Sequence, residues 1–215
     1  MAGLEETHRR VAALYSANLA EHGAGSRSVG WPDADAHRLR FERLARVLEA
    51  EPPDGPYTVC DWGCGLGALF GFLDARPGDL AAYRGYDLSP EMLAAARAQV
   101  RDPRAAFVLG SAVGEDADYT IVSGTFNVRL EAAEAEWAEH VRATLRTLWA
   151  RTRRGLAFNL LTSHVDWRDP HLFYADPAEW TGFCASELSR RVVLQHDYPL
   201  FEWTLLVLRA APHER

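Results

Sequence analysis

Lysine is absent from this sequence of 215 residues, so its 23 basic side chains other than histidine are all arginines. Aspartate and glutamate together number 30, which leaves a formal net charge of -7. Proteins that bind nucleic acid through phosphate contacts usually carry the opposite balance of charge. The composition therefore predicts no nucleic-acid partner.

Cysteine is scarce as well. The three cysteines, Cys60, Cys64 and Cys184, are odd in number and have no CxxC spacing. Neither a disulfide framework nor a thiolate zinc site is predicted. The polar stretch 169–176 lacks the spacing of a metal site too, and no metal is expected.

Long hydrophobic runs are missing. None approaches the roughly 18 residues expected of a membrane span, and the N-terminal residues show no apolar stretch after their basic ones. We expect a cytoplasmic protein with no membrane partner. A chain of this length with 48% hydrophobic residues is sufficient for one sizeable core.

What the sequence does contain is an alternation of strand and helix patterns. A short helical pattern precedes residue 22. Further helices are expected from about residue 35 to 51, after a glycine-rich turn up to about 75, over 90–100 and 131–151, and from 176. Strands are expected over 57–62, 83–87, 106–109, 119–123, 155–161, 192–196 and 201–208. Alternation predicts a doubly wound, mostly parallel sheet of seven strands. The connection 197–200 is so short that it joins antiparallel neighbours, which reverses the last strand.

The strongest local signal is the run Val59-Cys60-Asp61-Trp62-Gly63-Cys64-Gly65-Leu66-Gly67, a strand that enters a glycine-rich turn. Glycine allows positive φ angles and lets a ligand approach the backbone closely. Dinucleotide-binding turns space their glycines GxGxxG, whereas here the spacing is GxGxG. Asp87, at the end of the next strand, can accept hydrogen bonds from ribose hydroxyls. That feature indicates a nucleoside ligand without choosing between a dinucleotide and S-adenosylmethionine (SAM).

The GxGxG turn preceded by Asp61 resembles motif I of the class I SAM-dependent methyltransferases. Further resemblance lies in Gly110-Ser111-Ala112, in the run from Asp118 to Asn127, in 155–161 and in the final hairpin, over roughly residues 40–209. It is nearest to small bacterial members of unassigned substrate. The resemblance implies a Rossmann-like methyltransferase fold with SAM as cofactor, and leaves the methyl acceptor open.

The resemblance also implies a cofactor site and a cover. Residues 1–40 are expected to fold over the site as a helical segment, and 41–215 to form the catalytic domain. Trp31, His37 and Arg40 are candidates in the cover. Two interpretations of Arg40 stay open: it pairs with the carboxylate of SAM, or it lies on the polar side of an amphipathic helix. The expected cofactor-binding residues are Arg40, Asp61, Gly63, Cys64, Gly65, Gly67, Asp87, Leu88, Met92, Ser111, Ala112, Ser123 and Gly124.

Ligands of open α/β sheets bind outside the carboxyl ends of the strands, where the acceptor contacts should also lie. His164 is the first candidate for a general base, and Asn127 and Tyr198 are candidate acceptor contacts. Methyl transfer from a sulfonium depends mainly on alignment of donor and acceptor, so a base is not required.

We expect a small-molecule acceptor. Three alternatives stay open, namely a non-catalytic SAM-binding or scaffold protein, a methyltransferase acting on protein or RNA, and a nucleotide-dependent oxidoreductase. The oligomeric state is not predicted.

Overall fold

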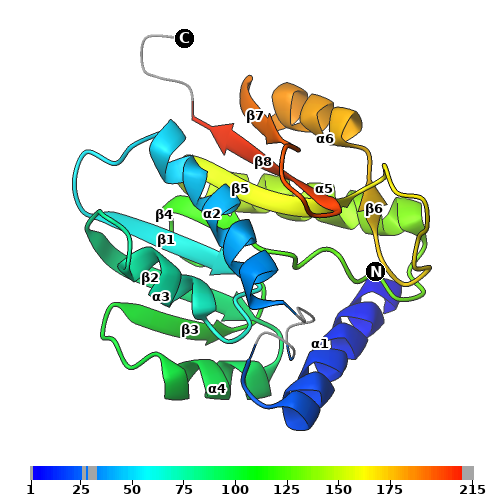
Figure 1. Ribbon diagram of the computed structural model, residues 1–215, viewed down its shortest axis with the longest axis horizontal. Helices are drawn as coiled ribbons and strands as arrows, with labels where there is room; N and C mark the ends of the chain where they lie inside the picture. Colours follow the sequence, from blue (N-terminus) through cyan, green and yellow to red (C-terminus); the bar gives the residue numbers. More distant parts are fainter. Residues whose placement is uncertain (1, 26–27, 29–32, 210–215) are drawn as a thin grey trace.

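One mixed sheet with helices on both faces forms the body of the protein (Figure 1). The computed structural model describes residues 2–25, 28 and 33–209. The strands are β1 (Tyr57–Trp62), β2 (Leu80–Asp87), β3 (Ala105–Leu109), β4 (Ala117–Val122), β5 (Thr152–Thr162), β6 (Tyr174–Ala175), β7 (Arg191–Gln195) and β8 (Glu202–Leu208). The helices are α1 (Ala2–His22), α2 (Ala34–Ala50), α3 (Ala68–Asp74), α4 (Pro90–Gln99), α5 (Glu134–Ala150) and α6 (Pro177–Phe183), with a π-helical turn at Cys184–Leu188.

The strand order is β3-β2-β1-β4-β5-β8-β7. Strand β8 runs antiparallel to both β5 and β7, while the other pairs in this order are parallel. The predicted Rossmann-like sheet with a reversed last strand is therefore confirmed. An eighth strand was not predicted, because β6 has only two residues, which pair with the end of β5 and are too few to show a periodicity.

Capping residues fix where the helices begin. Ser89 Oγ accepts a hydrogen bond from the Met92 N–H at 3.0 Å, and Pro90 occupies the first position of α4. Helix α5 starts three residues later than predicted, because residues 129–132 form a turn in which Leu130 has a φ of 51°.

The core lies on both faces of the sheet. Helices α2 and α3 cover one face and α5 and α6 the other (Figure 1). The apolar stripe predicted for α2 is buried as expected, with Phe41, Leu44 and Ala45 packed in the core.

Helix α1 lies near the edge where the parallel strands end (Figure 1). It is longer than the short helical pattern of the sequence suggested, and at 21 residues it reaches from α4 to α5. Ser16 Oγ is 2.9 Å from Ser89 Oγ beside α4, and His8 contacts His140 on α5. Helix α2 passes through residue 40 without a break, so the boundary expected there falls inside one helix. Among the described helices none has the length and hydrophobicity needed to cross a membrane.

Candidate functional site

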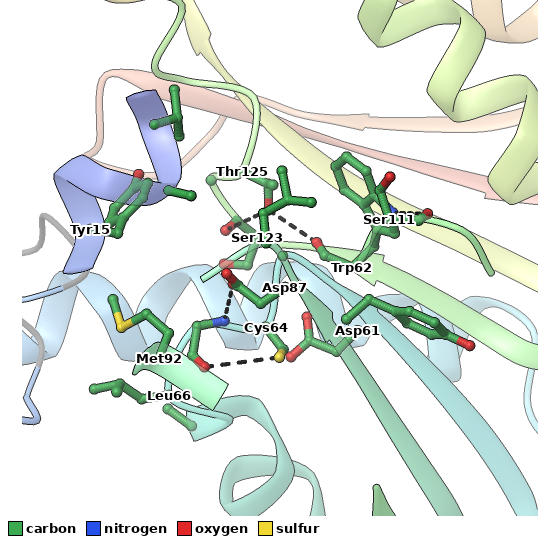
Figure 2. Close-up of a pocket in the computed structure, with 18 of the residues that line it drawn as sticks. Tyr15, Asp61, Trp62, Cys64, Leu66, Asp87, Met92, Ser111, Ser123 and Thr125 are labelled. Carbon is green, nitrogen blue, oxygen red and sulfur yellow. Dashed lines mark hydrogen bonds between the residues drawn. The ribbon is translucent and has the colours of Figure 1, made fainter. Parts of the chain in front are cut away.

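A cavity of about 230 Å³ opens at the carboxyl ends of β1, β2 and β4 (Figure 2). Its floor is the glycine-rich turn after β1, and its walls are the ends of β2 and β4 and the loop after β3. Helices α1 and α2 close it from above. This position is the one predicted for the ligand of an open α/β sheet.

The glycine-rich turn is held by backbone hydrogen bonds. The N–H groups of Gly63 and Cys64 both donate to the Tyr86 carbonyl, at 2.8 and 2.9 Å. Gly63 has a φ of 80°, and a Cβ added there would lie 2.2 Å from Thr125 Oγ1. Gly65 has a φ of 52° and lines the cavity. Gly63 is therefore required by the turn itself, whereas Gly65 has a φ that favours glycine and faces the cavity.

Asp87 lines the cavity beside the glycine-rich turn (Figure 2). Its Oδ2 accepts from the Gly65 N–H and its Oδ1 from the Ser89 N–H, each at 2.9 Å. Burial raises the pKa of Asp87, and these backbone donors oppose the rise. Because each carboxylate oxygen can accept a second bond, Asp87 can still receive both hydroxyls of a ribose.

A second carboxylate, Asp61, lies in the wall of the same cavity. The Tyr83 hydroxyl donates to it. Burial raises the pKa of Asp61 to about 7, and the charge of Asp87 adds to the rise. Among the described residues no arginine lines the cavity. Two carboxylates without a basic partner favour a cationic ligand such as a sulfonium and oppose the pyrophosphate of a dinucleotide. The residues therefore fit SAM.

Trp62 joins the loops on two sides of the cavity. Its Nε1 donates to the Ser111 carbonyl at 3.0 Å, and its own carbonyl accepts from Thr125 Oγ1 at 3.0 Å. The ring lies 5.3 Å from that of Phe126. Trp62 was not predicted as a site residue, although it adjoins predicted ones in the sequence.

The roof of the cavity comes from the first two helices. Val11, Ala12 and Tyr15 of α1 line it, together with His37 and Phe41 of α2. Burial lowers the pKa of His37 to about 4, with Arg40 adding to the effect. Burial, aided by the charge of Asp87, raises the pKa of Tyr15 to about 12. The α1 residues were missed, because a few apolar residues on a short helical pattern carry no site signal.

The structure brings most of the predicted cofactor residues together. Those that line the cavity are Asp61, Gly63, Cys64, Gly65, Asp87, Leu88, Met92, Ser111, Ser123 and Gly124. Gly67 and Ala112 are not among its lining residues. Gly67 instead precedes α3 with a φ of 72°, against the Phe107 ring. The predicted cover residue Trp31 lies outside the described residues.

Arg40 occupies a different place from the one predicted. It is not among the cavity-lining residues, and its Nε donates to Glu202 Oε2 on β8 at 2.7 Å, with both side chains buried. The guanidinium of Arg40 is thus neutralised by the Glu202 carboxylate, and the geometry does not support a contact with the carboxylate of SAM. On the strand next to β8, Asn159 Oδ1 accepts a hydrogen bond from the Gly124 N–H at 2.7 Å.

The three predicted catalytic residues do not line the cavity either. His164 is exposed and stacks on His196, with ring centroids 6.0 Å apart. The Tyr198 hydroxyl is 2.8 Å from Thr204 Oγ1 in the protein interior. The Asn127 amide is buried without a hydrogen-bond partner among the described residues.

The strand register explains the position of His164. Val122, the last residue of β4, pairs with Phe158 on β5. His164 follows Phe158 by six residues, which corresponds to about 20 Å of extended chain. Strand β5 therefore carries His164 well past the cavity.

Two comparisons with known proteins indicate the same family. Residues 59–155 match a family described as a methyltransferase domain. The chain is 44% identical over 160 residues to Rv1506c of Mycobacterium tuberculosis (strain ATCC 25618 / H37Rv), a protein named as a methyltransferase. That match covers 73% of this chain and 95% of the relative.

Solved structures share the fold at low sequence identity. Magnesium protoporphyrin IX methyltransferase from Synechocystis PCC 6803, crystallised with the demethylated product of SAM (SAH), superposes with a TM-score of 0.63 at 16% identity, over 82% of this chain and 84% of that one. The small RNA methyltransferase HEN1 superposes with a TM-score of 0.59 at 17% identity, over 81% of this chain and 25% of that one.

Proposed function

This chain belongs to the class I SAM-dependent methyltransferases, and we propose that it transfers the methyl group of SAM to a small-molecule nucleophile. The observation that carries the choice of acceptor is the roof of the cavity. Tyr15, His37 and Phe41 line the cavity from α1 and α2, so an acceptor beside the methyl group meets a largely apolar concave surface. We take that surface as the acceptor's way in. Such a surface suits a small molecule, because small-molecule sites are concave and mostly apolar with few polar groups.

We assign the cofactor contacts to the residues that line the cavity. Asp87 accepts hydrogen bonds from the ribose hydroxyls, and Gly65 lets the nucleoside approach the backbone. Asp61 pairs with the ammonium group of the methionine part. When bound, SAM supplies an electrophilic methyl group, and the protein mainly holds donor and acceptor in line.

On the acceptor side, His37 replaces His164 as the candidate histidine. It lines the cavity, and its lowered pKa keeps the ring neutral at pH 7. A neutral imidazole can accept a hydrogen bond from an acceptor hydroxyl or amine. A ring with a pKa of about 4 is a weak base, so we propose that His37 orients the acceptor.

The related structures do not decide the acceptor, since proteins of this fold are named for a porphyrin and for RNA. Two features of this chain disfavour RNA, namely the net charge of -7 and the lack of arginine among the described cavity-lining residues. The intact Gly65 and Asp87 argue against loss of cofactor binding, and transfer of the methyl group is what separates an enzyme from a non-catalytic SAM-binding protein.

Transfer of labelled methyl groups tests the proposal. The purified protein is incubated with SAM carrying a tritiated methyl group and an extract of the source organism, which is then separated into small molecules, RNA and protein. We expect label in the small-molecule fraction, and none above background with the Gly65→Val variant. Label confined to RNA or protein would refute the small-molecule acceptor, and SAM binding without transfer to any fraction would favour the scaffold.

A further inference from the structure

Two histidines meet where α1 crosses α5, away from the residues that line the cavity. His8 Nε2 lies 3.0 Å from His140 Nε2, although the two residues are 132 positions apart in the sequence. Both side chains are half-buried. Trp137 flanks both rings, at 6.1 Å from His8 and 5.2 Å from His140 between centroids.

The rings are not aligned as in a simple hydrogen bond. A collinear N–H···N bond of this length would hold the ring centroids about 5.3 Å apart, whereas they are 4.6 Å apart with planes inclined by 57°. The two nitrogens, 3.0 Å apart, are close enough for one ion to contact both. An ion at the zinc–imidazole length of about 2.1 Å from each nitrogen would hold them at an angle of about 90°, the angle between adjacent ligands in octahedral or square-planar coordination.

The surroundings keep both imidazoles ready to coordinate. Both rings are half-buried, and burial disfavours the charged imidazolium. A neutral imidazole is the form that binds metal. Glu5, one turn before His8 on α1, acts electrostatically on the His8 ring, and its negative charge favours a cation there.

We propose that His8 and His140 bind a divalent transition-metal ion of the zinc, nickel or copper class. Imidazole ligands suit these ions. In the described part of the chain no group of three or more His, Cys, Asp or Glu side chains is arranged to hold a metal ion, so water completes the coordination. Sequence spacing could not predict this pair, because its members lie on different helices.

Such an ion would hold helix α1, which forms part of the cavity roof, against helix α5. Helix α1 carries His8 on one stretch and the lining residues Val11, Ala12 and Tyr15 on the next. A metal that bridges α1 and α5 favours the arrangement in which these residues close the cavity. Metal and SAM should then raise each other's affinity by the same factor; this consequence rests on the proposed function, whereas the metal site does not.

Calorimetry with Zn²⁺ tests the site. The full chain, without a histidine tag and freed of metal by a chelator, is titrated with Zn²⁺ at pH 7.5. We expect saturable binding of one ion per chain at micromolar concentration, weakened about tenfold or more by His8→Ala or His140→Ala. His164→Ala is the matched control, because His164 belongs to an exposed pair whose rings stack 6.0 Å apart with planes inclined by only 28°. It should leave Zn²⁺ binding unchanged.

A second measurement uses the wild-type protein, so it does not depend on the folding of a variant. Diethylpyrocarbonate modifies accessible imidazoles, and Zn²⁺ should protect His8 and His140 but not His164, as read from peptide masses. Equal modification with and without Zn²⁺, or Zn²⁺ binding that His8→Ala leaves intact, would overturn the metal site. If Zn²⁺ binds but SAM affinity does not change, the proposed effect of the metal on the cavity roof is wrong. Failure to bind SAM both with and without Zn²⁺ would instead refute the proposed cofactor.

Discussion

Replacing Asp61 with asparagine tests the electrostatics of the cavity in the protein without ligand. Asparagine is similar in size and keeps an oxygen that can accept from the Tyr83 hydroxyl. The change therefore removes the ionisable group of a buried carboxyl, which is 2% exposed, with little effect on packing.

The magnitude follows from the pKa of Asp61, about 7 in the folded protein against 3.8 for the ordinary side chain. Between these values the folded protein holds a proton that the unfolded chain has released. The free energy of unfolding therefore falls as pH rises, by about 1.4 kcal/mol per pH unit and about 4 kcal/mol in all. Below pH 3.8 this contribution to stability is fully present, and above pH 7 it is lost. The Asp61→Asn variant lacks this slope.

Urea unfolding of both proteins at several pH values between 4 and 8, without SAM, measures the effect. We expect the stability of the variant relative to wild type to increase by about 4 kcal/mol across this range, with most of the change complete by pH 7. Asp54→Asn is the control, because the Asp54 side chain is 90% exposed. A difference between variant and wild type that stays constant with pH, or increases toward acid, would refute this account of Asp61.

Four further outcomes follow from the site. Asp87→Ala should weaken SAM binding about tenfold or more in calorimetry, because two charge-assisted hydrogen bonds are lost; an unchanged dissociation constant would reduce Asp87 to a structural acid. Gly65→Val should abolish SAM binding while the circular dichroism spectrum is kept, and loss of both would mean that the glycine serves folding. Once an acceptor is known, His37→Ala should raise its KM, whereas His164→Ala should change neither KM nor SAM affinity by more than about twofold; a large loss of turnover in the His164 variant would restore that residue as the base. Glu202→Ala should lower the free energy of unfolding by about 3–5 kcal/mol in a urea titration, because it removes the carboxylate that pairs with the buried guanidinium of Arg40, and a loss below 1 kcal/mol would contradict that role.

Local chemistry made much of the fold predictable from sequence. Ser89 and Pro90 mark the start of α4, the glycine turn marks the end of β1, and the short connection 197–200 reverses β8. Each of these signals depends on residues that are neighbours in the chain. For the same reason the turn and Asp87 located the cofactor cavity.

Positions that depend on distant partners were not predictable. Arg40 has the charge expected of a residue that binds a carboxylate, but the carboxylate it meets belongs to Glu202 on β8. His164 follows the fifth long strand as expected, yet β5 extends beyond β4 and carries it away from the cavity. Sequence shows where a strand ends, whereas the register with its neighbour decides what that end can reach.

The place of β8 in the sheet has a consequence for how the protein is made. Every residue from Glu202 to Leu208 is buried, and this strand, which follows all the other described strands in the sequence, lies between β5 and β7. During synthesis the nascent chain can form its earlier βα units. Strands β5 and β7, however, cannot pair with β8 until it has emerged after both of them. Until then their facing edges are unpaired, and such edges promote aggregation. Emergence of β8 from the ribosome, rather than assembly of the glycine turn, should therefore set when the enzyme first becomes competent, and a nonsense mutation shortly before Glu202 should yield an insoluble product even though it spares every residue that lines the cavity.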